Sequence, residues 1–145
     1  MAKKPAKKAA KRSTESSARH PNVTAWFETK LEAEWGPYDL KHALDENPES
    51  VVVLDTRDRE SFEEERLPHA INIPGQELKG RLNELPKSKA IVPYCWTITC
   101  HLATRAALLL AQKGFTVHEL AGGIGMWKDY KFPVESAKKE PASVA

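Results

Sequence analysis

Apolar and polar positions follow one another along the chain in short runs of two kinds. Residues 51–54 form an unbroken run of three valines and a leucine between polar residues, the pattern of a strand buried on both faces. Further apolar runs predict strands at residues 70–73, 89–94 and 115–120. Helices are predicted between the strands, at residues 38–44, 61–65, 78–85, 102–113 and 124–130. Strands that alternate with helices predict an α/β domain with a mainly parallel sheet.

Two segments have less simple patterns of apolar positions. Residues 27–35 alternate between apolar and polar, as a strand would, yet Phe27, Leu31 and Trp35 also recur at the spacing of a helix. We predict one or two helical turns at residues 22–28, followed by a short strand that ends before Gly36-Pro37. In residues 102–113 the apolar positions cover most of the helix circumference, so we expect this helix to be deeply buried, with Gly114 at its C-terminal end.

Length and charge suggest one folded domain with two tails. The chain has 145 residues, enough for one hydrophobic core. Residues 1–20 hold five Lys, two Arg and one Glu, a net charge of +6 within a total of +2. We predict a disordered basic tail at 1–20, a folded domain at 21–136 and a disordered tail at 137–145. The basic tail contains no aromatic residue, so we expect it to aid solubility and to make at most weak contacts with nucleic acid.

The remaining composition argues against several classes of protein. No apolar run approaches the roughly 20 residues of a membrane span, and the first residues lack the apolar stretch of a secretory signal. Cys95 and Cys100 are close neighbours and cannot cross-link distant parts of the chain, so we expect a reducing, cytoplasmic location. A metal site is not expected at these cysteines and His101, because zinc ligands usually come in pairs from two separated segments. We expect a monomer without cofactor or membrane contact.

The candidate chemistry lies where two predicted strands end. In parallel sheets, ligands bind beyond the carboxyl ends of the strands. Asp55 and Arg57 follow one strand, and residues 95–101 connect another directly to the helix at 102–113. A cysteine at a helix N-terminus has its pKa lowered from about 8.5, which favours the nucleophilic thiolate. Cys95 is therefore a candidate nucleophile. The alternative interpretation is that Cys95 is an inert buried thiol.

These residues resemble the rhodanese-like domain family. The first half of the resemblance is Val51-Val-Val-Leu-Asp-Thr-Arg57, Phe62 and Pro68-His-Ala-Ile-Asn-Ile-Pro74. The second half is Ile91-Val-Pro-Tyr-Cys95, Ala106-Ala107, Gly114-Phe115, Leu120-Ala-Gly-Gly-Ile124, Trp127 and Pro133-Val134. The resemblance implies a five-stranded, mainly parallel sheet flanked by helices on both faces. It also implies that Cys95 carries sulfane sulfur as a persulfide.

The sequence departs from the family pattern at three places. The usual Gly-His-Ile of the first half reads Glu65-Arg66-Leu67, and Pro93 interrupts a predicted central strand. The active loop usually ends with Arg five residues after the cysteine, where this chain has Cys100. The connection from Cys95 to Ala106 is also two residues longer, which resembles a long-loop subgroup of the family.

The leading hypothesis is a sulfurtransferase that works by a ping-pong mechanism through Cys95. Asp55 and Arg57 would support the active site, although a structural ion pair of Arg57 with Glu60 or Glu64 is the simpler interpretation. The partners would be a small donor, either thiosulfate or a thiol or protein persulfide, and a thiol or protein acceptor. We expect poor use of thiosulfate, because the loop beyond Cys95 carries no cation. The substrate-binding residues would be the rest of the loop: Trp96, Thr97, Ile98, Thr99, Cys100 and His101.

Alternative hypotheses remain. Phosphatase or arsenate-reductase chemistry usually needs an Arg six residues after the cysteine, where this chain has His101. A non-catalytic persulfide carrier or regulatory module is compatible with the missing loop Arg. Cys100 could resolve a persulfide or sulfenate on Cys95 as an internal disulfide, or it could have no role. Gly122 and Gly123 are expected to shape the backbone rather than bind phosphate, and Trp127 is expected in the core.

Overall fold

The computed structural model describes residues 21–137 and divides into two units, one up to Glu32 and one from Ala33 onward. The first unit contributes most of helix α2 (Pro21–Ala33), along which the rings of Trp26 and Phe27 meet edge to face. The predicted strand over 29–33 is therefore wrong. Hydrogen bonds within a helix satisfy the backbone of this segment, whereas a strand would need a neighbour. The tails predicted at 1–20 and 137–145 lie outside the described residues, except for Ala137.

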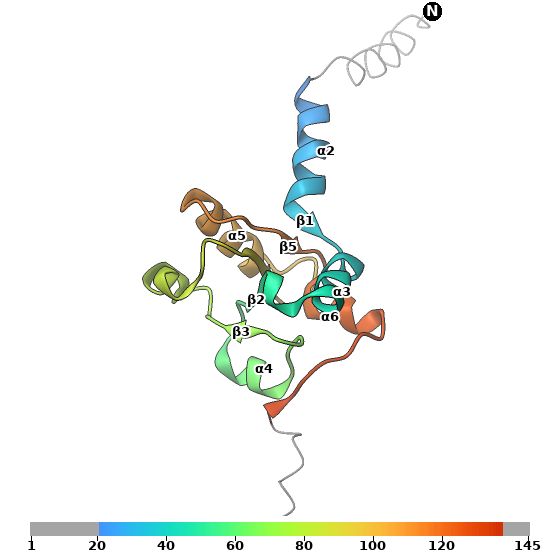
Figure 1. The fold of residues 1–145 in the computed structure, drawn as a ribbon, viewed down its shortest axis with the longest axis vertical. Helices are drawn as coiled ribbons and strands as arrows, with labels where there is room; N and C mark the ends of the chain where they lie inside the picture. The colour runs from blue at the N-terminus through green and yellow to red at the C-terminus, as the bar shows by residue number, and fades with distance from the viewer. Residues whose placement is uncertain (1–20, 138–145) are drawn as a thin grey trace, which may run out of the picture. The chain divides into compact units, whose positions relative to one another are not determined.

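The second unit contains the alternating strands and helices that the sequence predicts (Figure 1). Its strands are β1 (Glu34–Trp35), β2 (Val51–Asp55), β3 (Ile71–Asn72), β4 (Ala90–Tyr94) and β5 (Glu119–Leu120). Its α-helices are α3 (Pro37–Glu46), α4 (Arg59–Glu64), α5 (Leu102–Gln112) and α6 (Gly123–Asp129). Short 3₁₀ turns η1 (Pro48–Ser50), η2 (Leu78–Gly80) and η3 (Leu82–Glu84) complete it. None of the helices in residues 21–137 is long and apolar enough to cross a membrane.

The strands pair in parallel, as predicted. They form a three-stranded sheet in the order β3-β2-β4 and a two-stranded sheet of β1 and β5. A single parallel bridge between Ile91 and Val117 links β4 to the segment that leads into β5. The strands thus form two sheets where the family resemblance implies one five-stranded sheet, because β5 is regular only over Glu119–Leu120.

Alternate residues of β2 and β4 supply two separate hydrophobic cores, one on each face of the sheet. Val51 and Val53 of β2 pack with α3 and α6, and Trp127 is fully buried there as predicted. Leu54 packs on the opposite face with α5. The last residues of β2 and β4, Asp55 and Tyr94, belong to the face covered by α3 and α6.

Two predicted helices differ from the structure. Helix α5 is not buried on all sides: Ala103, Ala106 and Leu110 face the core, whereas Leu102 and Leu108 are 40% and 60% exposed. A helix that covers one face of a sheet buries one stripe only, however apolar its remaining positions are. The helix predicted at residues 78–85 consists of η2 and η3 instead, and only its anchoring leucines, Leu78 and Leu85, are buried.

Pro93 is tolerated in β4 because it faces the side of the strand on which pairing ends at Ile91. The amide of Ile91 donates to the Thr116 carbonyl and its carbonyl accepts from the amide of His118, so the backbone of Ile91 faces the β5 side. Backbone groups alternate in direction along a strand, so Pro93 faces the same side as Ile91. The parallel bridge on that side is at Ile91, and the proline ring lies beyond it. The missing N–H therefore costs no ladder hydrogen bond to β2.

Candidate active site

The loop between β4 and α5 contains both cysteines of the chain. Cys95 follows β4 directly and is 2% exposed, whereas Cys100 is partly exposed. The two are joined by a disulfide, and their Cα atoms are 6.4 Å apart. The amide of Cys100 donates to the Thr97 carbonyl, so the loop turns back toward its own start. The structure thus represents the oxidised form of the site.

The backbone of Cys95 is held by the first turn of α6. The carbonyl of Cys95 accepts a hydrogen bond from the amide of Ile124 at 3.0 Å, and that of Trp96 accepts from the amide of Gly125 at 2.9 Å. Gly123 has a φ of 59°, and a Cβ there would lie 2.9 Å from the carbonyl carbon of Cys95. The predicted role of this glycine in backbone shape therefore has a specific form, because only glycine lets α6 approach the loop so closely.

Asp55, Arg57 and Tyr94 form a buried polar cluster beneath the loop. Each side chain is at most 1% exposed. Arg57 donates to Asp55 through Nε at 3.0 Å and Nη2 at 2.6 Å, and Nη2 also donates to the carbonyl of Glu65. The hydroxyl of Tyr94 donates to Asp55 Oδ2 at 2.5 Å and accepts from the amide of Leu67. Arg57 therefore forms the structural ion pair considered above, but with Asp55 and not with Glu60 or Glu64.

The electrostatics of this cluster keep Arg57 and Tyr94 in fixed protonation states. Burial alone lowers the pKa of Arg57, but the hydrogen bonds and charge of Asp55, helped by Tyr94, raise that pKa above its usual value. Burial, followed by the charge and hydrogen bond of Asp55, raises the pKa of the Tyr94 phenol well above its usual value. Tyr94 consequently stays a donor and Arg57 stays a cation throughout the physiological range.

The cluster reaches the loop through one aromatic contact. The Arg57 guanidinium lies 4.5 Å from the ring centroid of Trp96, which is 45% exposed. Beyond Trp96, Ile98 is 75% exposed, and the hydroxyls of Thr97 and Thr99 lie 3.2 Å apart. His101 is exposed at the N-cap of α5 and its side chain makes no capping bond. The structure thus brings Asp55, Arg57 and Trp96 together and joins Cys95 to Cys100, while the remaining loop residues are exposed: Thr97, Ile98, Thr99 and His101.

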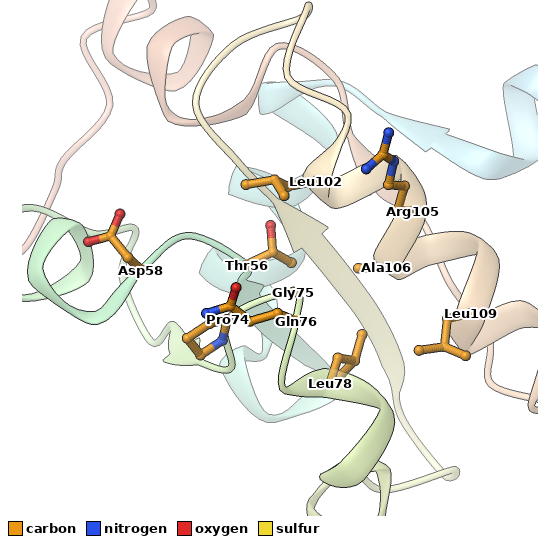
Figure 2. Close-up of a pocket in the computed structure, with 10 residues that line it drawn as sticks. All are labelled: Thr56, Asp58, Pro74, Gly75, Gln76, Leu78, Leu102, Arg105, Ala106 and Leu109. Carbon is orange, nitrogen blue, oxygen red and sulfur yellow. The ribbon is translucent and has the colours of Figure 1, made fainter.

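A cavity of about 580 Å³ lies beside the base of the loop (Figure 2). Thr56 in its wall donates to the Tyr94 carbonyl, one residue before Cys95, and Leu102 in its wall is the first residue of α5. Figure 2 shows three segments around it: the turn after β2, the turn after β3 and one side of α5. The lining comprises Thr56, Asp58, Pro74, Gly75, Gln76, Leu78, Leu102, Arg105, Ala106 and Leu109.

Sequence reasoning missed several residues of the site. The sequence places Tyr94 in a predicted strand and in the family pattern but indicates no role for it; its register opposite Asp55 is the signal for the hydrogen bond between them. None of the sequence motifs above includes Arg105, and its position one turn into α5 explains why it reaches the cavity. No local pattern marks Thr56, because its role depends on a partner 38 residues away.

Comparison with known proteins places this geometry in context. A model of the rhodanese-like domain matches residues 37–130. The thiosulfate sulfurtransferase GlpE of Coxiella burnetii is 30% identical over 90 residues, which are 61% of this chain and 81% of that protein. The HTH-type transcriptional regulator Rv0324 of Mycobacterium tuberculosis is 35% identical over 85 residues, 59% of this chain. The match spans only 38% of that regulator.

Solved structures resemble this chain over most of their own length. The BH2092 protein from Bacillus halodurans is 37% identical with a TM-score of 0.73, and the match covers 81% of this chain and 88% of that one. A rhodanese-related protein from Thermoplasma volcanium is 26% identical with a TM-score of 0.61, over 70% and 96% of the two chains.

Proposed function

The chain belongs to the rhodanese-like domain family, and on that basis we propose that its reduced form is a sulfurtransferase with Cys95 as the sulfur carrier. The observation that supports this most is the position of Cys95. It follows strand β4 directly, in a loop whose backbone is bound by α6 and which leads into α5. A thiolate in that place is favoured by the positive end of the helix dipole.

The proposed reaction has two half-steps. The Cys95 thiolate attacks the outer sulfur of a donor, for example thiosulfate, and the S–S bond of the donor breaks to release sulfite. With a thiol persulfide as donor, the leaving group is the thiolate instead. Cys95 then holds one extra sulfur as a persulfide, and an acceptor thiolate or another thiophile attacks that terminal sulfur and restores the Cys95 thiolate.

The cavity beside the loop supports an organic persulfide as the preferred donor. Its volume lies within the range of roughly 300–1,000 Å³ that is typical of sites for whole organic ligands. Its apolar wall of Leu78, Leu102 and Leu109 suits a carbon skeleton, and Arg105 offers a cation for a carboxylate. Thiosulfate has no carbon skeleton to contact the leucines and no carboxylate to bind Arg105. We therefore propose a low-molecular-weight thiol persulfide with a carboxylate group.

Steady-state kinetics of the reduced full-length chain tests this proposal. With glutathione persulfide as donor and cyanide as acceptor, double-reciprocal plots should be parallel, as a ping-pong mechanism requires. Cys95→Ser should abolish turnover. Arg105→Gln should raise KM for glutathione persulfide about tenfold, the loss of one charge-assisted hydrogen bond, and leave kcat for thiosulfate close to that of the parent. Turnover by Cys95→Ser at the parent rate would disprove the assignment.

A second candidate function is a regulatory module without turnover. It is favoured by one observation, the 35% identity to a segment of a transcriptional regulator. The two proposals differ in a simple way. A regulatory module would accept one sulfur on Cys95 or none, and would show no multiple turnover with any donor and acceptor. Sustained turnover of the isolated chain excludes this candidate.

A further inference from the structure

The proposed transfer reaction uses only one cysteine of the loop, yet the second, Cys100, is bonded to it. We propose that Cys100 resolves the Cys95 persulfide, so that the domain reduces sulfane sulfur to hydrosulfide in addition to passing it on. This inference rests on the proposed function, because it requires a persulfide on Cys95. The bound sulfur then has two possible fates, transfer to an acceptor or release as hydrosulfide. The fate depends on whether an acceptor or Cys100 attacks first.

The geometry of the loop determines which sulfur atom Cys100 can attack. A persulfide has an inner sulfur, which is Cys95 Sγ, and a terminal sulfur. The disulfide shows that Cys100 Sγ can approach the inner sulfur to bonding contact while Cys95 remains 2% exposed. Attack at the inner sulfur expels the terminal sulfur, whereas attack at the terminal sulfur would only move it to Cys100. The structure therefore favours expulsion.

The reaction needs Cys95 to stay in place while Cys100 moves, and the two ends of the loop differ in this respect. The carbonyls of Cys95 and Trp96 are fixed by amides of α6, so the persulfide would be held at a constant position. Cys100 lies after four exposed residues, and its amide is bonded only locally, to the carbonyl of Thr97. Few buried contacts have to break for this part of the loop to open or close. Cys100 can thus leave room for a donor and return afterwards.

The proposed step balances as follows. The Cys100 thiolate attacks Cys95 Sγ, a Cys95–Cys100 bond forms, and the bond from Cys95 Sγ to the terminal sulfur breaks. The terminal sulfur leaves as hydrosulfide with its proton and the electron pair of that bond. The sulfane sulfur is reduced by two electrons, and the two cysteine thiolates are oxidised to the disulfide.

An external dithiol would complete the cycle. Its thiolate has to attack a sulfur of the disulfide, and Cys100 is the more exposed of the two residues. A mixed disulfide then forms on Cys100 and Cys95 leaves as the thiolate that accepts the next sulfur. The second thiol of the reductant releases Cys100. The reductant class is therefore a dithiol, and the net reaction converts a persulfide and a dithiol into a thiol, hydrosulfide and a disulfide.

A single-turnover experiment tests this proposal. The reduced full-length chain, freed of reductant, is mixed with excess glutathione persulfide, and free sulfide and intact mass are measured after an acid quench. The parent chain should release one sulfide per chain beyond the amount released by Cys100→Ser in parallel, and its mass should fall by two hydrogens. Cys100→Ser should gain the mass of one sulfur. Cys100→Ala repeats this with a smaller side chain, and Leu108→Ala, on the exposed side of α5, should match the parent.

Each outcome is decisive. If the parent chain keeps the extra sulfur, on either cysteine, and forms no disulfide, resolution by Cys100 is wrong while sulfur carriage stands. If both Cys100 variants release sulfide as the parent does, resolution is likewise wrong. If neither the parent nor the Cys100 variants take up sulfur or release sulfide, the proposed function fails, and the inference fails with it.

Discussion

Replacing Asp55 by Asn should destabilise the domain strongly. Asp55 is fully buried and accepts three hydrogen bonds from the side chain of Arg57, which is 1% exposed. The substitution leaves a buried guanidinium without its counterion, and breaking a buried ion pair in this way costs about 3–5 kcal/mol. Tyr94 also loses a charged acceptor for its hydroxyl. By comparison, Tyr94→Phe should cost only about 1–3 kcal/mol, since it leaves the buried amide of Leu67 without a partner.

Urea denaturation of the oxidised chain measures this effect. With a slope of about 1–3 kcal/mol per molar urea, a loss of 4 kcal/mol lowers the midpoint by roughly 1–4 M. A second variant separates the ion pair from general disruption. Asp55→Asn combined with Arg57→Met removes both charges, so it should be more stable than the sum of the two single losses predicts. A cost below about 1 kcal/mol for Asp55→Asn, or additivity within about 0.5 kcal/mol, would refute the reasoning.

Three further predictions concern other parts of the chain. Gly123→Ala should lower the melting temperature and abolish sulfur transfer, because its positive φ and the backbone of Cys95 leave no room for a Cβ; unchanged values would contradict the assigned approach of α6. Hydrogen bonds from Ser61 hold the pKa of Asp58 below its usual value, so the Asp58 carboxylate should stabilise the fold at neutral pH. Asp58→Ala should therefore lower the melting temperature at neutral pH, and the difference from the parent should vanish as pH falls through that lowered pKa. Calorimetric melting from neutral to acidic pH checks this. Removing residues 1–20 should leave melting temperature and transfer rate unchanged, and a large drop would show that the tail binds the domain.

The parts of the fold that the sequence predicted well are those with strong local patterns. The β-branched run of β2 and the apolar periodicity of α5 each allow one structure only, and both were placed within two residues. Residues 27–35 carry a pattern that fits both a helix and a strand. Neighbours decide such cases, and no neighbour can be read from a single segment.

The candidate site could be predicted in part for a similar reason. The position of Cys95 follows from the order of strand, loop and helix, which local patterns reveal. The partner of Arg57 does not, because Glu60 and Glu64 suit an ion pair by spacing on the chain equally well. The choice of Asp55 depends on the side chain of Arg57 turning back under the sheet edge, where Tyr94 and the carbonyl of Glu65 complete its surroundings.

The central claim, that Cys95 carries sulfur, is tested most directly by locating the sulfur atom. Reduced Cys100→Ser is incubated with glutathione persulfide, freed of donor, alkylated, digested and mapped by mass spectrometry. The account predicts one extra sulfur on the peptide that contains Cys95, and its loss after addition of cyanide. Peptides without extra sulfur, in a variant that melts like the parent, would contradict the claim.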